Sequence, residues 1–163
     1  MPADANEGTD PMLTSRLLIL GFVAGFVAVL IFHQGLWYLC NQIGLIPPER
    51  PAWPLDPIPP FSVPSVISKA FWGGVWGAVL VLLLGRFSGA SYWANWILVG
   101  AIALPLVGFF VVPPLKGEPI PQLWPRFLVA MLLNGTWGFG TAFLLRLAGA
   151  GVPLIPEGKE QRS

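Results

Sequence analysis

The sequence predicts an all-α integral membrane protein with four transmembrane helices. Only 10% of the 163 residues are charged, whereas soluble domains carry about 25%. Hydrophobic residues make up 55% of the chain, and the mean hydropathy is +0.69. The few charged residues are also placed so that four long uncharged stretches lie between them. Together these observations exclude an ordinary soluble domain.

Each uncharged stretch is close to the length that a membrane-spanning helix needs. About 20 mostly apolar residues cross a hydrocarbon core of roughly 30 Å. The second stretch is the shortest because Lys69 lies near its start, and we expect this amine to extend toward the lipid headgroups. The expected helices span residues of about 17–39, 66–85, 92–112 and 127–146.

The four helices form one predicted transmembrane domain over residues 16–149. Residues 1–15 and 150–163 are polar, so we expect loosely ordered tails there rather than further domains. The first stretch is longer than the roughly 7–15 apolar residues of a signal peptide and follows an acidic segment. We therefore interpret it as a retained helix.

Four crossings place both termini on one side of the membrane. That side carries five of the nine Lys and Arg residues, so the positive-inside rule favours cytoplasmic termini by a narrow margin. We expect the inner membrane of a bacterium. The two proline-rich connections, at about 46–65 and 113–125, then face the exterior.

The chain also contains an internal repeat of helical hairpins. Asp-Pro-Ile-Pro at 56–59 recurs as Glu-Pro-Ile-Pro at 118–121, and Gly-Val-Trp-Gly at 74–77 recurs as Gly-Thr-Trp-Gly at 135–138. Because each copy holds two crossings, the copies run in the same direction and are related by an axis along the membrane normal. The competing interpretation is coincidence in a composition rich in Gly, Pro and Trp.

Small residues recur at helical spacing on three of the expected helices. In lipid, helices associate through close packing at such positions. The candidate helix-packing residues are Gly21, Gly25, Gly73, Gly77 and Gly138. Packing within the chain is the favoured interpretation, and a homodimer interface or a path for a solute are the alternatives.

Four residues are candidates for ligand binding. His33 is ionisable and lies within a membrane segment, which makes it a functional hypothesis, although a hydrogen bond near the interface would also explain it. Solute or quinone contact and metal or haem ligation are further alternatives for His33. Asn134 is expected at a similar depth, and the repeat places Trp76 and Trp137 at matching positions. The four could therefore converge on one cavity, or serve only in packing.

Several kinds of chemistry lack the residues they need. A single cysteine excludes an internal disulfide and a Cys-rich metal site, and a single histidine cannot supply both ligands of a bis-histidine haem within one chain. A net charge of +1 argues against nucleic-acid binding. No acidic residue lies within an expected crossing, and no nucleotide-binding motif is present. We expect no metal and no cofactor, and the sequence disfavours enzymatic activity without excluding it.

The expected function is that of a non-catalytic subunit or assembly partner of a membrane complex, because packing signals are many and chemical groups are few. The alternative is a transporter or channel for a small solute or ion that works as a homo-oligomer. The hairpin repeat and the polar stripe of Asn134, Gly138 and Thr141 motivate that alternative. The expected partners are the lipid bilayer and either a second copy or another membrane protein.

Overall fold

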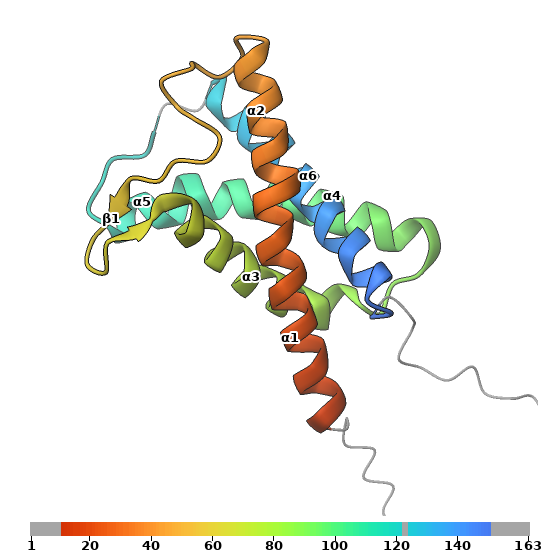
Figure 1. Cartoon of the computed structure of the whole chain (residues 1–163). Coiled ribbons are helices and arrows are strands. Elements are labelled where there is room, and N and C mark those ends of the chain that lie inside the picture. Colours follow the sequence, from red (N-terminus) through yellow and green to blue (C-terminus); the bar gives the residue numbers. More distant parts are fainter. Residues whose placement is uncertain (1–10, 122–123, 151–163) are drawn as a thin grey trace, which may run out of the picture.

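The chain folds into four long helices in a computed structural model that describes residues 11–121 and 124–150 (Figure 1). The first and third long helices each contain a π-helical segment, a wider turn within an α-helix. A short antiparallel ladder of β1 and β2 precedes the second long helix. The elements are α1 (Pro11–Ala28), η1 (Val29–His33), α2 (Gln34–Gln42), β1 (Pro57–Ile58), β2 (Val63–Pro64), α3 (Ser65–Leu84), α4 (Gly89–Leu106), η2 (Val107–Val111), α5 (Val112–Leu115) and α6 (Arg126–Leu147).

The four expected helices are confirmed, and each is long and apolar enough to cross a membrane. α3 and α6 begin and end within one residue of their predicted bounds. The first long helix has 32 residues and the third has 27, so both extend beyond the predicted spans. The difference arises because both helices continue through residues, such as Asn41 and Pro113, that are unusual inside an apolar stretch.

The first helix begins earlier than predicted. Residues 11–15 belong to α1, so the prediction of a loosely ordered tail over 1–15 is wrong for these five residues. Pro11 opens the helix, where its missing N–H costs least, and the Ser15 hydroxyl donates to the Pro11 carbonyl at 2.9 Å. The remaining tail segments, 1–10 and 151–163, lie outside the described residues.

In both long helices with a π segment, a backbone carbonyl in or next to that segment is not bonded as in a regular α-helix. In the first, the Trp53 indole nitrogen, from the loop after α2, donates to the Leu30 carbonyl at 3.0 Å. In the third, Pro105 has no N–H, so the Ala101 carbonyl lacks its helical partner just before η2 begins. The widened turns therefore coincide with carbonyl groups that are bonded differently from those of a regular helix.

The helices pack in two pairs, each formed by helices that follow one another in the chain. α1 lies against α3, and α4 lies against α6. In the first pair a Cβ at Gly77 would collide with the Gly21 carbonyl oxygen, and a Cβ at Gly25 would collide with the Gly73 carbonyl oxygen. Glycine at these positions lets the two backbones touch, so the two GxxxG patterns meet within one chain.

The second pair makes the corresponding contacts. A Cβ at Gly138 would collide with the Trp96 carbonyl oxygen, and a Cβ at Gly100 would lie 2.5 Å from the Asn134 carbonyl oxygen. The contacting positions are offset by 61 residues on the second helix of each pair (73 to 134, 77 to 138) and by 75 on the first helix (21 to 96, 25 to 100).

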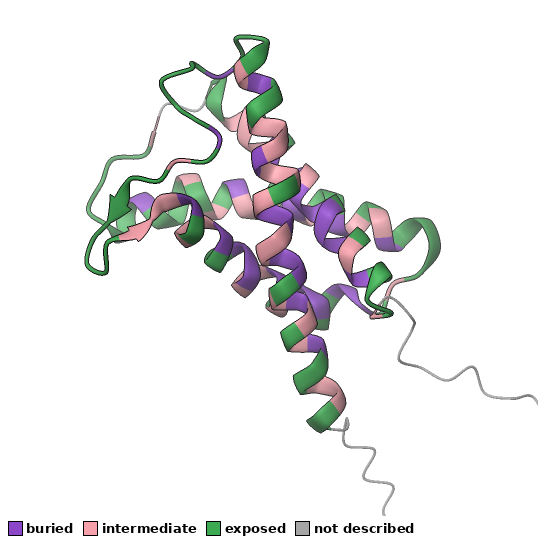
Figure 2. Ribbon diagram, viewed as in Figure 1, coloured by how far each residue is buried: buried purple, intermediate pink, exposed green. Residues whose placement is uncertain are grey.

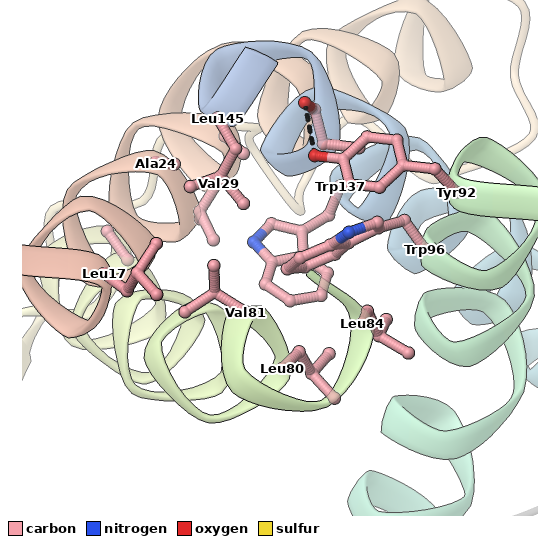
Figure 3. Packing of buried hydrophobic residues seen from close by; sticks show 13 residues of the cluster. Leu17, Ala24, Val29, Leu80, Val81, Leu84, Tyr92, Trp96, Trp137 and Leu145 are labelled. Carbon is pink, nitrogen blue, oxygen red and sulfur yellow. Dashed lines mark hydrogen bonds between the residues drawn. The ribbon is translucent and has the colours of Figure 1, made fainter. Parts of the chain in front are cut away.

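α1 and α6 join the two pairs through a cluster of aromatic residues. Trp137 on α6 is 1% exposed, and its indole nitrogen donates to the Gly25 carbonyl at 2.9 Å. Trp96 lies beside Trp137, and the Tyr92 hydroxyl donates to the Ala142 carbonyl at 3.0 Å (Figure 3). The cluster therefore holds α6 against both α1 and α4.

Burial is concentrated where the helices cross, and the outward faces of the helices are exposed (Figure 2). Many of the exposed side chains are large and apolar, as expected for surfaces that face lipid. They include Ile19, Val23, Ile31, Leu82, Leu98, Ile102, Leu132 and Phe143. α3 and α4, in contrast to α1 and α6, make few contacts with each other.

Candidate functional site

A cavity of about 870 Å³ lies between α3 and the third long helix, which make few contacts with each other. α3 lines it from Ser65 to Val79, and the opposite side runs from Leu104 to Lys116. Residues of η1 and α6 complete the wall. The volume falls within the range of roughly 300–1,000 Å³ that is usual for ligand pockets. A smaller hollow, lined only by residues of α1, is a surface groove of one helix.

All four candidate ligand-binding residues line this one cavity. They come from three different elements: η1 contributes His33, α3 contributes Trp76, and α6 contributes Asn134 and Trp137. Residues separated by about a hundred positions in the chain thus share one site. The arrangement brings His33 and Asn134 to the same side of the bundle, as a shared site requires.

His33 is held by its neighbours at the end of η1. Its Nδ1 donates to the Gln34 Oε1 at 3.0 Å, and its ring lies 6.1 Å from the Trp37 ring, centroid to centroid. Gln34 is fully buried, and its Nε2 has no hydrogen-bond partner within residues 11–121 and 124–150. The Gln34 amide therefore fixes the imidazole, whose Nε2 stays free of any bond within that described part of the chain.

Asn134 uses only part of its hydrogen-bonding capacity. Its Nδ2 donates to the Ala130 carbonyl of its own helix at 2.8 Å. The side-chain oxygen makes no bond to any of the residues that the structure describes, and the residue lines the cavity. An amide oxygen in an apolar wall can therefore accept a hydrogen bond from a bound molecule.

The two tryptophans differ in their bonding. The Trp137 indole N–H donates to the Gly25 carbonyl, so only the apolar surface of this ring faces the cavity. Trp76 is half-buried, and its N–H has no partner within the described ranges. Trp76 can therefore contribute a donor as well as a stacking surface.

Two lysines and two serines of the cavity wall were not among the predicted site residues. Lys69 and Ser68 lie on the first turns of α3, Ser65 begins that helix, and Lys116 follows the end of α5. The sequence contains one signal for Lys69, because Lys69, Gly73 and Trp76 follow i, i+4, i+7 spacing and share a helix face. Lys116 has no such signal, because it lies outside the regular part of its helix.

Lys69 is positioned by an aromatic ring rather than by a carboxylate. Its Nζ lies 4.7 Å from the centroid of the Trp37 ring, and the Trp37 indole nitrogen donates to the Arg50 carbonyl at 2.9 Å. A cation held against a ring face in this way keeps its charge available to a ligand. Within the described part of the chain, neither Lys69 nor Lys116 lies within ion-pair distance of a carboxylate.

Among the residues that the structure describes, no acidic residue lines the cavity, and the nearby loop covers the start of α3. The backbone N–H groups of Ser65 and Val66 donate to the carbonyls of Asp56 and Pro54. The Ser65 hydroxyl also donates to the Pro54 carbonyl, at 3.1 Å. The loop therefore satisfies this end of α3 through backbone carbonyls, while the Asp56 carboxylate is not part of the wall.

Other reactive groups lie away from the cavity. Cys40 is buried in a separate cluster with Ile46 and Leu133. Over the ranges that the structure describes, no group of three or more His, Cys, Asp or Glu residues could hold a metal ion. The arrangement is therefore suited to binding an apolar molecule that carries a few polar groups.

No known protein family, curated protein or solved structure matches this chain. The functional proposal below therefore depends on the geometry of the cavity.

Proposed function

We propose that the protein is an integral membrane protein that binds a small amphiphilic molecule in the cavity between α3 and the third long helix, and that it acts as a non-catalytic carrier or transporter. The observation that carries this proposal is the composition of the cavity wall. Apolar side chains surround a few polar groups contributed by separate helices, which is the usual construction of a small-molecule site.

Membrane insertion is supported by the length of the four helices and by their exposed apolar faces. We place the termini and the α3–α4 turn in the cytoplasm and the loop containing β1 and β2 outside. The Lys and Arg counts support this orientation by the margin of five to four noted above. The membrane that fits this proposal is the inner membrane of a bacterium.

We infer that the two helix pairs are related by duplication. The support is that equivalent backbone contacts recur at constant offsets, 61 residues on one helix and 75 on the other. The offset of 61 is also that of the repeated Gly-x-Trp-Gly segment. Compositional coincidence would produce similar residues but has no reason to produce the same pairs of touching residues.

The polar wall favours a ligand over a packed partner helix. An apolar helix docked between α3 and the third long helix would bury Lys69, Asn134 and His33 against hydrocarbon, which costs free energy unless each group finds a partner. A small molecule with its own polar groups avoids that cost.

A non-catalytic subunit of a membrane complex is the second candidate function. One observation favours it: α3 and α4 make few contacts with each other and both expose large apolar side chains, such as Phe71 and Leu83 on α3 and Leu98 on α4. A partner subunit, or a second copy of this chain, would cover those side chains. It would also have to supply groups that pair with the lysines.

Filling the cavity tests the proposal. Gly108 lines the cavity, and a Cβ added there meets no atom within 4 Å, so Gly108→Phe adds a ring to the wall without disturbing the backbone. Gly35→Phe is the matched control, because its Cβ also meets nothing within 4 Å and the residue is not in the wall. The measurement is labelling of purified protein in lipid nanodiscs by phospholipids with a photoreactive acyl chain, mapped by mass spectrometry.

We expect label on the segments 65–84 and 104–116 in the unmodified protein and in Gly35→Phe, and a loss of most of that label in Gly108→Phe. Equal labelling of the two variants would contradict the proposal. Copurification of a stoichiometric membrane partner that protects these segments from label would favour the second candidate instead.

A further inference from the structure

We infer that the ligand of the cavity is an amphiphile with an anionic head group, held by Lys69 and Lys116, with its chain in the apolar part of the cavity. This inference rests on the proposed function and specifies the chemistry of its ligand. It follows from the charge of the wall, from where the charges lie along it, and from its length.

The charge of the cavity wall has one sign. Lys69 and Lys116 are its only charged residues within the described part of the chain, and neither has a carboxylate partner there. Lys69 is half-buried and Lys116 is exposed, and a half-buried amine such as that of Lys69 gains when an anion binds beside it. Lysine provides a compact positive charge of the kind that binds phosphate and carboxylate groups.

Both charges lie at one end of the cavity. Lys69 lies in the second turn of α3, and Lys116 directly follows the last residue of α5. The start of α3 and the end of α5 lie near each other beside β1 (Figure 1). Ser68 precedes Lys69 in α3 and also lines the cavity, so a hydroxyl that can donate to an anion lies in the same part of the wall.

The far end of the cavity is apolar. Val79 and Leu104 line it, ten residues after Lys69 and twelve residues before Lys116 in the chain. From Ser65 to Val79 the wall extends over 14 helical steps, about 21 Å at 1.5 Å per residue. One leaflet of a bilayer is about 15 Å of hydrocarbon, so the wall is long enough for one chain with the head group beside the lysines.

Phospholipids and fatty acids share this chemistry, and their labelling distinguishes them. Three photoreactive probes with the same chain are used on the full-length protein in nanodiscs: phosphatidylglycerol, phosphatidylcholine and a free fatty acid. We expect phosphatidylglycerol or the fatty acid to label segments 65–84 and 104–116 at least several-fold more than phosphatidylcholine. Whichever anion labels more strongly identifies the head group.

The double variant Lys69→Gln/Lys116→Gln should remove the preference. One lysine near a membrane surface favours an anionic lipid by roughly fivefold, so the double variant should bring anionic and zwitterionic probes close to equal labelling. The control variant Arg50→Gln/Arg126→Gln removes the same charge from residues outside the cavity wall and should keep the preference. Phosphatidylcholine labelling should change little in either variant, which checks that both fold.

The outcomes separate this inference from the proposed function. Equal labelling of the cavity by all three probes in the unmodified protein would overturn the anionic ligand and leave a neutral amphiphile in the same cavity. An equal loss of preference in the arginine control would also overturn it, because surface charge in general would then explain the effect. Absence of label from the cavity with every probe would instead contradict the proposed function.

Discussion

Trp137 serves the fold and the candidate site at once. Its N–H bonds the Gly25 carbonyl across the interface of α1 and α6, while its ring forms part of the cavity wall. Gly73 permits this position, because a Cβ there would lie 3.2 Å from the Trp137 indole nitrogen. The ring is therefore fixed before any ligand binds, which lowers the entropic cost of binding.

Replacing Trp137 by Phe should lower the free energy of unfolding by about 1–2 kcal/mol, from the lost interhelical hydrogen bond and the smaller ring. The measurement is an equilibrium unfolding titration with sodium dodecyl sulfate in mixed micelles. Trp72→Phe is the control, because Trp72 is 59% exposed. A control variant as unstable as Trp137→Phe would show that the hydrogen bond has no particular importance.

Replacing Asn134, unlike replacing Trp137, should affect ligand binding and leave the stability of the fold nearly unchanged. Its only hydrogen bond in the described part of the chain is to its own helix, so Asn134→Ala should leave the folded yield and the unfolding titration nearly unchanged. We expect it, and His33→Ala, to reduce photolabelling of the cavity by the preferred probe. A halved folded yield in Asn134→Ala would return this residue to a structural role.

The candidate residues could be found from sequence only where they were unusual. A histidine and an asparagine within apolar stretches are unusual, and so is a tryptophan repeated at a fixed offset, so all of these were predicted as candidates. Lys69 shares a helix face with Gly73 and Trp76, but a lysine near a helix end ordinarily extends to the headgroups, which is the position expected for it from sequence. Its position against Trp37 depends on the course of the loop that carries the Arg50 carbonyl, which no local pattern predicts.

At the scale of elements, the spacing of charged residues predicted the helices, because an uncharged stretch of this length has few alternatives to a helix. The glycines at helical spacing lie where backbones come close, but their spacing does not show that α1 packs against α3 and α4 against α6. The π segments were not predicted. They depend on where carbonyls find other partners, as at Leu30, and on tertiary contacts.

The equivalent crossings should respond equally to an added methyl group. Gly77→Ala and Gly138→Ala each drive a Cβ into a backbone carbonyl, at Gly21 and Trp96, so each should lower the free energy of unfolding by about 1–3 kcal/mol. Gly35→Ala is the control, because a Cβ there meets nothing within 4 Å. The dodecyl sulfate titration measures all three, and a cost confined to one crossing would argue against equivalent hairpins.

At the scale of the whole molecule, the cavity exists because the two halves are not symmetric. α1 and α6 pack closely, whereas α3 and α4, their counterparts in the inferred duplication, do not. Trp137 packs beside Gly73, and in the inferred duplication the counterpart of that glycine is Asn134, which lines the cavity. The two halves thus differ at this position, where one has a glycine in a closed interface and the other an asparagine in the cavity wall.

The topology of the whole chain can be tested by the labelling of single cysteines. In a Cys40→Ala background, Ser62→Cys lies in the loop between β1 and β2, and Ser88→Cys lies in the turn between α3 and α4; both positions are exposed. Because α3 lies between them, a membrane-impermeant maleimide added to intact cells should label residue 62 and reach residue 88 only after permeabilisation. The proposed orientation requires that order: labelling of residue 88 alone would invert it, and labelling of both in intact cells would show that α3 does not cross the membrane.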